Sequence, residues 1–279
     1  MTEIILGTGI LIILIAFLSE YVDSTLGMGY GTILTPVLLL MGFQPLQVVP
    51  AVLLSELITG VLAGIIHHCV GNVNLKPKTL NPKKIFSAIK KLGFKQSFKR
   101  GIPGHLKVSL LIAACSIVGS VVAVFVAINL PKFYLKLYIG LLVFVIGVVI
   151  LATLNKNYGF SWKKIIGLSL IASFNKGMSG GGYGPVVTGG QLLSGINEKN
   201  AIGITSLAEG LTCGVAIIAY LLTKSIIDWS LAPYLMVGAV LSVPLSAYTI
   251  KKIKTKGLRK IIGFATITLG LFTLIKLFI

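Results

Sequence analysis

Five charged side chains interrupt the apolar stretches of this chain. Glu20, Asp23, Glu56 and Glu209 are four of its seven acidic residues, and Lys176 follows a run of apolar residues. A charge in the middle of a membrane costs about 3 kcal/mol or more, so a functional role is the default hypothesis for such residues. A buried carboxylate can carry a proton, and a buried ammonium can bind an anion. These five residues are therefore the first candidates for chemistry.

Two glycine clusters offer a second way to bind an anion. Residues 27–31 read Gly-Met-Gly-Tyr-Gly, residues 180–184 read Gly-Gly-Gly-Tyr-Gly, and a short apolar run follows each cluster. Glycine permits positive φ and close approach to a ligand. A helix that starts at such a loop, as Pro185 favours, directs free backbone amides and the positive end of its dipole toward the loop. An anion there gains several N–H contacts. The alternative is that the glycines allow helices to pack closely.

The composition indicates the environment of these residues. The chain has 279 residues, of which 55% are hydrophobic and 11% are charged, and its mean hydropathy is +0.96. Soluble domains carry about 25% charged residues. This apolar content excludes a disordered chain and leaves a polytopic membrane protein. The net charge of +18 is then first an orientation signal, and we expect no nucleic acid as a partner.

Ten apolar segments predict an all-α polytopic membrane protein. Eight runs are of near-spanning length, at 4–22, 46–68, 107–129, 134–154, 164–175, 199–223, 231–250 and 258–278. Two shorter runs, 31–42 and 184–195, follow the glycine clusters. A span needs about 20 residues, so the short runs begin or end inside the membrane. We predict about eight long helices and two short half-helices, with the first segment retained as a helix because no signal peptide is evident.

The two halves of the sequence resemble each other. A shift of 153 residues gives identities at 11 of the 33 positions from Gly27 to Thr59, and it aligns Glu56 with Glu209. We therefore predict two transmembrane repeats of five segments, residues 1–154 and residues 155–279. Repeats with an odd number of segments enter the membrane from opposite sides, and such inverted repeats are a common plan of secondary transporters.

The basic residues predict how the chain is oriented. If the first helix and the short run after it form an out-and-back pair, 20 of the 25 Lys and Arg residues lie on one side. Ten of them fall between Lys76 and Lys107. The positive-inside rule then predicts a multi-pass protein of the cell membrane with a basic cytoplasmic loop at 69–106 and both termini outside. Phenylalanines among the lysines of 76–107 favour contact with anionic lipid.

Several motifs resemble those of the sulfite exporter TauE/SafE family of membrane permeases. They are the duplicated glycine loop, Ala-Ile-Gly-Ile-Thr-Ser at 201–206, and His-Cys-Val-Gly-Asn-Val at 68–73. The resemblance covers about residues 4–278. The first half departs from the pattern, because Met28 interrupts its glycines and Val52-Leu53 replace the Thr-Ser pair. The resemblance implies transport of sulfite, organosulfonates or related small sulfur-containing anions.

The expected substrate site combines the two glycine loops with nearby donors. The candidate substrate-binding residues are Gly29, Tyr30, Gly31, Lys176, Gly181, Gly182, Tyr183, Gly184, Thr205 and Ser206, with Asn175 and Ser179 as further donors. Asp23, Glu56 and Glu209 are the candidates for coupling or gating. A structural role that ties the repeats together remains open for the two glutamates. Lys176 either adds charge to the anion site or pairs with Asp23 or Glu20 across the repeat interface.

Other functional classes have less support in the sequence. No HExxH, GxGD or diphosphate-binding motif is present, so we expect neither an enzyme nor a catalytic residue. We also expect no cofactor and no metal site, since His67, His68 and Cys69 are adjacent and point in different directions. The alternative function is a cation or metal-ion carrier or channel that uses Glu56 and Glu209. The sequence leaves a homo-oligomer open.

Overall fold

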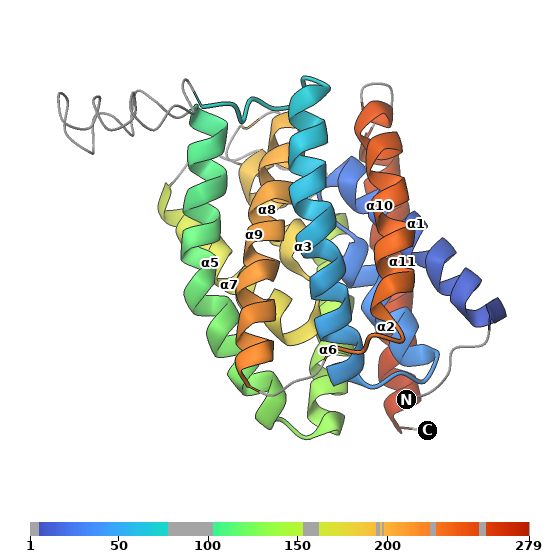
Figure 1. Ribbon diagram of the computed structural model, residues 1–279. Coiled ribbons are helices and arrows are strands. Elements are labelled where there is room, and N and C mark those ends of the chain that lie inside the picture. Colours follow the sequence, from blue (N-terminus) through green and yellow to red (C-terminus); the bar gives the residue numbers. More distant parts are fainter. Residues whose placement is uncertain are drawn as a thin grey trace.

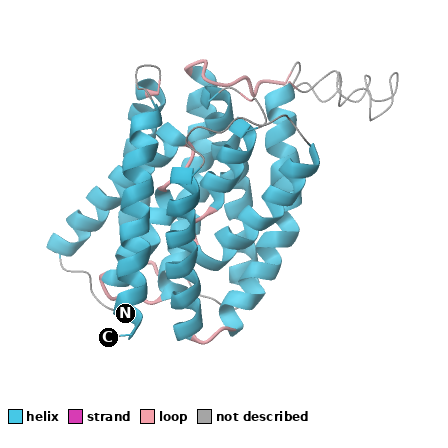
Figure 2. Cartoon of the chain, turned by 180° about the vertical axis from the view of Figure 1, so that it is seen from behind, coloured by secondary structure: helices cyan, strands magenta, loops and turns pink. Residues whose placement is uncertain are grey.

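The computed structural model describes residues 6–77, 103–152, 162–193, 196, 198–223, 227–250 and 255–278. Its helices are α1 (Leu6–Leu26), α2 (Tyr30–Leu40), α3 (Pro45–Cys69), α5 (Gly104–Asn129), α6 (Lys132–Ala152), α7 (Trp162–Ser179), α8 (Tyr183–Leu193), α9 (Glu198–Leu222), α10 (Ala232–Thr249) and α11 (Thr255–Phe278). Within these ranges the chain forms helices and loops but no strand (Figure 2). The prediction of an all-helical protein is therefore confirmed. Most of the basic loop expected at 69–106 lies outside the described residues.

Helix lengths separate two helices from the rest. α2 and α8 have 11 residues each, and each begins after a glycine cluster. Of the other described helices, six are long and apolar enough to cross a membrane, namely α1, α3, α5, α6, α9 and α10. Their outward surfaces carry large apolar side chains such as Leu18, Val118 and Leu241, each more than 60% exposed. Such a surface suits lipid, because soluble monomers rarely expose large contiguous apolar patches.

Helices from the two halves of the chain pack against each other. The most extensive contacts pair α6 with α11, α1 with α10, α5 with α7, and α3 with α9, so each pair joins one half to the other. In Figure 1, α3 runs upward and α9 runs downward. α3 ends at the upper end of the view, and α9 ends at the lower end.

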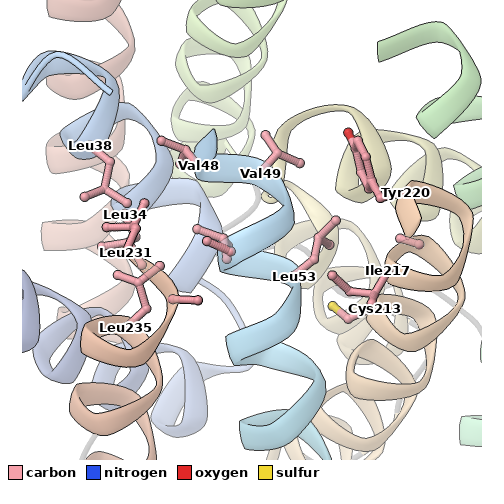
Figure 3. Close-up of a cluster of buried hydrophobic side chains, with 14 of the residues drawn as sticks. Leu34, Leu38, Val48, Val49, Leu53, Cys213, Ile217, Tyr220, Leu231 and Leu235 are labelled. Carbon is pink, nitrogen blue, oxygen red and sulfur yellow. The ribbon is translucent and has the colours of Figure 1, made fainter. Parts of the chain in front are cut away.

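Buried apolar side chains of the described residues form clusters that include both glycine loops. The largest includes residues of α2, the start of α3, the end of α9 and the start of α10, and Figure 3 labels ten of its side chains, including Leu34, Val49 and Leu235. Tyr30 belongs to this cluster and Tyr183 to a smaller one. Protein interiors of this kind are close-packed. Both short helices therefore begin against packed apolar side chains.

Candidate functional site

The breaks between α1 and α2 and between α7 and α8 have matching backbones. Gly27 has a φ of 67° and its counterpart Gly180 has a φ of 71°. Their amides close equivalent turns, to the carbonyl oxygen of Asp23 at 2.6 Å and to that of Lys176 at 2.8 Å. L-residues with a side chain rarely adopt this conformation, whereas glycine adopts it at little cost. The glycine pattern therefore forms two helix breaks, as the sequence predicts.

The two glycine loops pack directly against each other. A Cβ atom on Gly31 would overlap the carbonyl oxygen of Gly180, and one on Gly181 would lie 2.8 Å from the carbonyl carbon of Gly31. Gly184 approaches the backbone of Gly27 in the same way. The Gly182 amide donates to Thr32 Oγ1 at 3.1 Å. Close backbone packing, the alternative use of these glycines, is thus present at both clusters, and an anion reaches their amides only if the loops separate.

The N-termini of the two short helices differ in charge. At α2, the Tyr30 amide donates to Asp23 Oδ1 at 3.2 Å, so a carboxylate of the protein already lies at the positive end of the helix dipole. The residue equivalent to Asp23 in the second half is Lys176. The second helix break therefore has a cationic residue at the sequence position where the first has a carboxylate.

Lys176 is buried at the centre of the protein and binds two glutamates. Its Nζ lies 2.5 Å from Glu56 Oε2 and 2.6 Å from Glu209 Oε1. The Lys176 side chain is 1% exposed. Glu56 and Glu209 are equivalent residues of the two halves, so one ammonium joins α3, α7 and α9. Lys176 does pair with acidic residues across the two halves, but its partners are these glutamates and not Asp23 or Glu20.

Each of the two glutamates keeps one oxygen without a partner. Glu56 Oε1 and Glu209 Oε2 are buried and accept no hydrogen bond. Cys213 is on the same helix as Glu209, and its Sγ lies 3.9 Å from Glu56 Oε2. Carboxylates usually accept several hydrogen bonds when they are buried. The two free oxygens are therefore available to a proton, a cation or a water.

Glu20 completes the central group of acidic residues. Ser24 Oγ lies 2.7 Å from its Oε1, and Thr59 Oγ1 lies 3.2 Å from its Oε2. Glu20 lies inside an apolar run and is one of the five charged candidates from the sequence, but it is not among the residues predicted for substrate binding, coupling or gating. Burial among hydroxyl groups of α1 and α3 is what connects it to the site.

The two tyrosines of the glycine loops point into the protein. The hydroxyl of Tyr30 is 2.8 Å from Ser55 Oγ, and the hydroxyl of Tyr183 accepts a hydrogen bond from Thr212 Oγ1 at 3.2 Å. Both tyrosines are fully buried. Each therefore anchors its short helix to the long helix that follows it, α3 or α9.

Thr205 and Ser206 have different surroundings. Thr205 Oγ1 lies 2.9 Å from Thr188 Oγ1 and accepts a hydrogen bond from Gln191 Nε2 at 2.8 Å. Ser206 lies with the acidic residues, and its hydroxyl donates to the Ile202 carbonyl oxygen at 3.0 Å. Gln191 is not among the site residues predicted from the sequence, although it stands where the first half has an apolar residue, Leu38. That difference between the repeats was the available signal.

The remaining candidates have structural partners. Asn175 Oδ1 accepts a hydrogen bond from the Tyr138 hydroxyl at 2.7 Å, and Ser179 Oγ accepts one from the Gly181 amide at 3.1 Å. His67 Nε2 is 3.0 Å from the Ser24 carbonyl oxygen, and Asn72 is hydrogen-bonded to the other ring nitrogen. In the ranges that the structure describes, no group of three or more His, Cys, Asp or Glu residues could hold a metal ion.

Comparisons with known proteins cover nearly the whole chain. The sequence profile of the family described as sulfite exporter TauE/SafE matches residues 12–80 and 85–273, which include both helix breaks and all five central charges. A curated relative, the probable membrane transporter protein YtnM of Bacillus subtilis (strain 168), is 26% identical over 275 residues, which are 94% of this chain and 81% of the relative. No solved structure matches at a significant level.

The family fixes the class of protein. Its profile matches the apolar helices as well as the breaks between them, so the chain is a multi-pass membrane protein and a transporter, not an enzyme. The family also implies a small transported substrate. The match covers nearly the whole chain, including both glycine breaks. The chain therefore belongs to the sulfite exporter TauE/SafE family of membrane transporters.

Proposed function

We propose that the protein transports a small sulfur-containing anion, such as sulfite, an organosulfonate or a related oxyanion. The observation that carries this proposal is the buried Lys176, which lies in the last turn of α7 just before the break that precedes α8. An anion at this break gains both the ammonium and the amides at the start of a helix. The family description names sulfite, and the proposal extends that chemistry to this chain.

The substrate site is proposed at α8 and not at both short helices. The carboxylate of Asp23 already accepts a hydrogen bond from the first amide of α2. A second anion there would be repelled by Asp23 at short range. Among the candidate residues, Lys176, Gly181, Gly182, Tyr183 and Gly184 therefore form the anion site, while Gly29, Tyr30 and Gly31 form the surface against which this loop closes.

The two halves, 1–154 and 155–279, are proposed to act as inverted repeats that move relative to each other. Support comes from the matching breaks and from the opposite directions of α3 and α9 (Figure 1). In transporters of this plan, substrate access alternates between the two sides around a site near the midplane. Separation of the packed glycine loops is the movement that would expose the amides of α8. Thr205 and Ser206, on α9, would then line the path.

The test is transport by the purified protein in proteoliposomes. We expect uptake or efflux of at least one anion from a panel of sulfite, sulfate, thiosulfate and short organosulfonates. Lys176→Met should abolish this flux, whereas Lys132→Met, which removes an exposed lysine at the start of α6, should leave it unchanged. If no anion moves, or if Lys176→Met transports normally, the proposal is wrong.

The orientation is a second part of the proposal, with both termini outside. Cys69 is exposed and precedes the connection from α3 to α5, which is expected in the cytoplasm. Trp229 is 62% exposed and lies in the connection from α9 to α10. In intact cells, an impermeant maleimide should label Trp229→Cys in a Cys69→Ser background, and should label Cys69 only after permeabilisation. The reverse pattern would contradict the proposed orientation.

The alternative function, a cation carrier without an anion substrate, also has an observation in its favour. Four buried carboxylates surround one buried ammonium, and two of their oxygens lack a partner. Under this alternative, a cation gradient would dissipate across the proteoliposomes in the absence of every anion in the panel. Flux that requires an anion excludes it.

A further inference from the structure

The acidic residues at the centre line a small cavity of about 10 Å³. The polar residues around it are Glu20, Asp23, Glu56, Thr59, Ser206 and Glu209. These residues come from α1, α3 and α9, and each is at most 7% exposed. A volume of this size holds about one water molecule or one small ion. Glu56 and Glu209 face the cavity on one side and Lys176 on the other.

The charges around this cavity do not balance. Four carboxylates, Glu20, Asp23, Glu56 and Glu209, are buried with one ammonium, Lys176. If all five were ionised, the group would carry a net charge of −3. An uncompensated charge in a protein interior costs several kcal/mol. Tyr30 on α2 and Cys213 on α9 supply no positive charge, and α10, which packs on α1, contains no charged residue. His67 on α3 donates from Nε2 to the Ser24 carbonyl oxygen and accepts from Asn72 at its other ring nitrogen, so this imidazole is neutral. Bound protons or cations must therefore supply the missing charge.

Thr59 places a hydroxyl beside Glu20. Its Oγ1 donates to Glu20 Oε2 at 3.2 Å and also lies 3.2 Å from the Ser55 carbonyl oxygen. One hydroxyl hydrogen is thus shared between two acceptors, so Glu20 Oε2 accepts only a long hydrogen bond. A proton on Glu20 Oε2 would donate to Thr59 Oγ1 and would let the Thr59 hydroxyl donate to Ser55. It would also remove one negative charge from the group.

We propose that the cavity binds the coupling cation of the transporter, with Glu20 as the residue that holds it. The cation is a proton on Glu20. The described side chains include no group of three or more acidic residues already arranged around a metal ion, so Na⁺ in the same place is the second source that the experiment distinguishes. The free oxygens Glu56 Oε1 and Glu209 Oε2 are two further acceptors for the cation. This inference rests on the proposed anion transport, because it links the cavity to the anion through Lys176.

The link runs through the two glutamates that the cavity and Lys176 share. A cation on Glu20 reduces the negative charge of the group that holds the Lys176 ammonium through Glu56 and Glu209, and Lys176 then becomes more available to an anion. Binding of either ligand therefore favours the other, and such coupling is reciprocal. Cation and anion should move together in the same direction.

The decisive variant is Glu20→Gln, which keeps the size of the side chain and its acceptor for Ser24 but cannot exchange a proton. Wild-type proteoliposomes should accumulate the anion when either a pH gradient or a Na⁺ gradient is imposed. With one proton per anion, a gradient of one pH unit supports about tenfold accumulation, the ratio that corresponds to 1.4 kcal/mol. Glu20→Gln should lose this accumulation while it still exchanges internal for external anion. The matched control is Asp228→Asn, a carboxylate in the loop before α10.

The two cation sources give different results. Accumulation that survives replacement of Na⁺ by N-methylglucamine, and disappears with a protonophore, identifies the proton. The opposite result identifies Na⁺. If Glu20→Gln accumulates the anion like wild type, or if neither gradient drives accumulation in a protein that transports the anion, the proposal is overturned.

A binding measurement keeps the cation site separate from the anion proposal. The thermal unfolding temperature of the purified protein should rise when pH is lowered from about 8 to about 6, or when Na⁺ replaces N-methylglucamine, because a ligand of the folded state stabilises it. This response should be absent in Glu20→Gln and present in Asp228→Asn. A Glu20-dependent response without anion flux supports the cavity and rejects the anion. A wild-type protein that responds to neither cation overturns the cation site.

Discussion

The break between α1 and α2 and the break between α7 and α8 share a backbone but differ in charge. Both use glycines with positive φ, and both end in a tyrosine that anchors a short helix. At equivalent positions, however, the first break has Asp23 and the second has Lys176. Asp23 caps its own short helix, whereas Lys176 binds the two equivalent glutamates Glu56 and Glu209.

This difference teaches how a repeated scaffold can contain a single polar site. The repeated features, glycines and the two glutamates, are those on which the backbone geometry depends. The features that differ, such as Asp23 against Lys176 and Leu38 against Gln191, decide where charge and hydrogen bonds lie. The second half thus contributes the cation, whereas the first half contributes three of the four buried carboxylates, Glu20, Asp23 and Glu56.

Of the changes that test this comparison, removal of the Lys176 ammonium should have the largest effect on stability and transport. Lys176→Met leaves Glu56 and Glu209 buried without their partner, and loss of one member of a buried ion pair costs about 3–5 kcal/mol. We expect a lower unfolding temperature in detergent and no anion flux. Adding Glu209→Gln to Lys176→Met should recover part of the lost stability. An unfolding temperature equal to that of wild type would show that the pair contributes nothing.

Alanine substitutions in the glycine loops should have the next largest effect on the free energy of unfolding. Gly181→Ala places a Cβ against the backbone of Gly31, and overpacking of a dense interior costs about 1–3 kcal/mol or more. Gly189→Ala in α8 is the matched control, since a Cβ there meets nothing within 4 Å. Chemical or thermal unfolding measures both. Equal stability of the two variants would contradict the close packing of the two loops.

Two equivalent threonines, Thr35 and Thr188, differ between the halves by one hydrogen bond. Thr188 Oγ1 donates to the Gly27 carbonyl oxygen at 2.7 Å, while Thr35 Oγ1 is buried without a partner. Thr188→Val should therefore cost about 1 kcal/mol, and Thr35→Val should be neutral or stabilising. The difference in unfolding free energy between the two variants is the measurement. A larger loss at Thr35 would refute the asymmetry.

The smallest expected change in stability concerns Gln191. Gln191→Leu gives α8 the residue that α2 has at the equivalent position. It removes one hydrogen bond to Thr205 but also removes the buried, unpaired Gln191 Oε1, so the net effect on stability should stay within about 1 kcal/mol. Transport should fall, because a polar contact near the opening of the site becomes apolar. Unchanged flux would separate Gln191 from the transport path.

The elements of this fold follow closely from the sequence. Long apolar runs predict the long helices, and the glycine clusters predict the starts of α2 and α8 to within one residue. Helix formation and helix breaks depend on residues that are near each other in the chain, so a local pattern is sufficient to predict them. The duplicated glutamates also mark the centre of the protein, because a charge in an apolar run must lie away from lipid.

The site itself follows only in part. The sequence identifies Lys176, Glu56 and Glu209 as candidates, yet it does not show that the three meet. It marks Glu20 as a charge in an apolar run without assigning it a place in the site, and it does not select Gln191. Their contacts depend on how α1, α3, α7 and α9 rotate and cross, which is decided by packing between distant segments. The same packing places the glycine loops against each other.

The sequence by itself determined the membrane environment, the helix breaks, the repeat and the identity of the buried charges, because each is a property of composition or short-range pattern. Only the tertiary structure decided that one ammonium lies between two equivalent glutamates, that Asp23 occupies the end of α2, and that Glu20 lines a cavity. Ion pairs and cavities form between helices, and their energies depend on distances that no single helix defines.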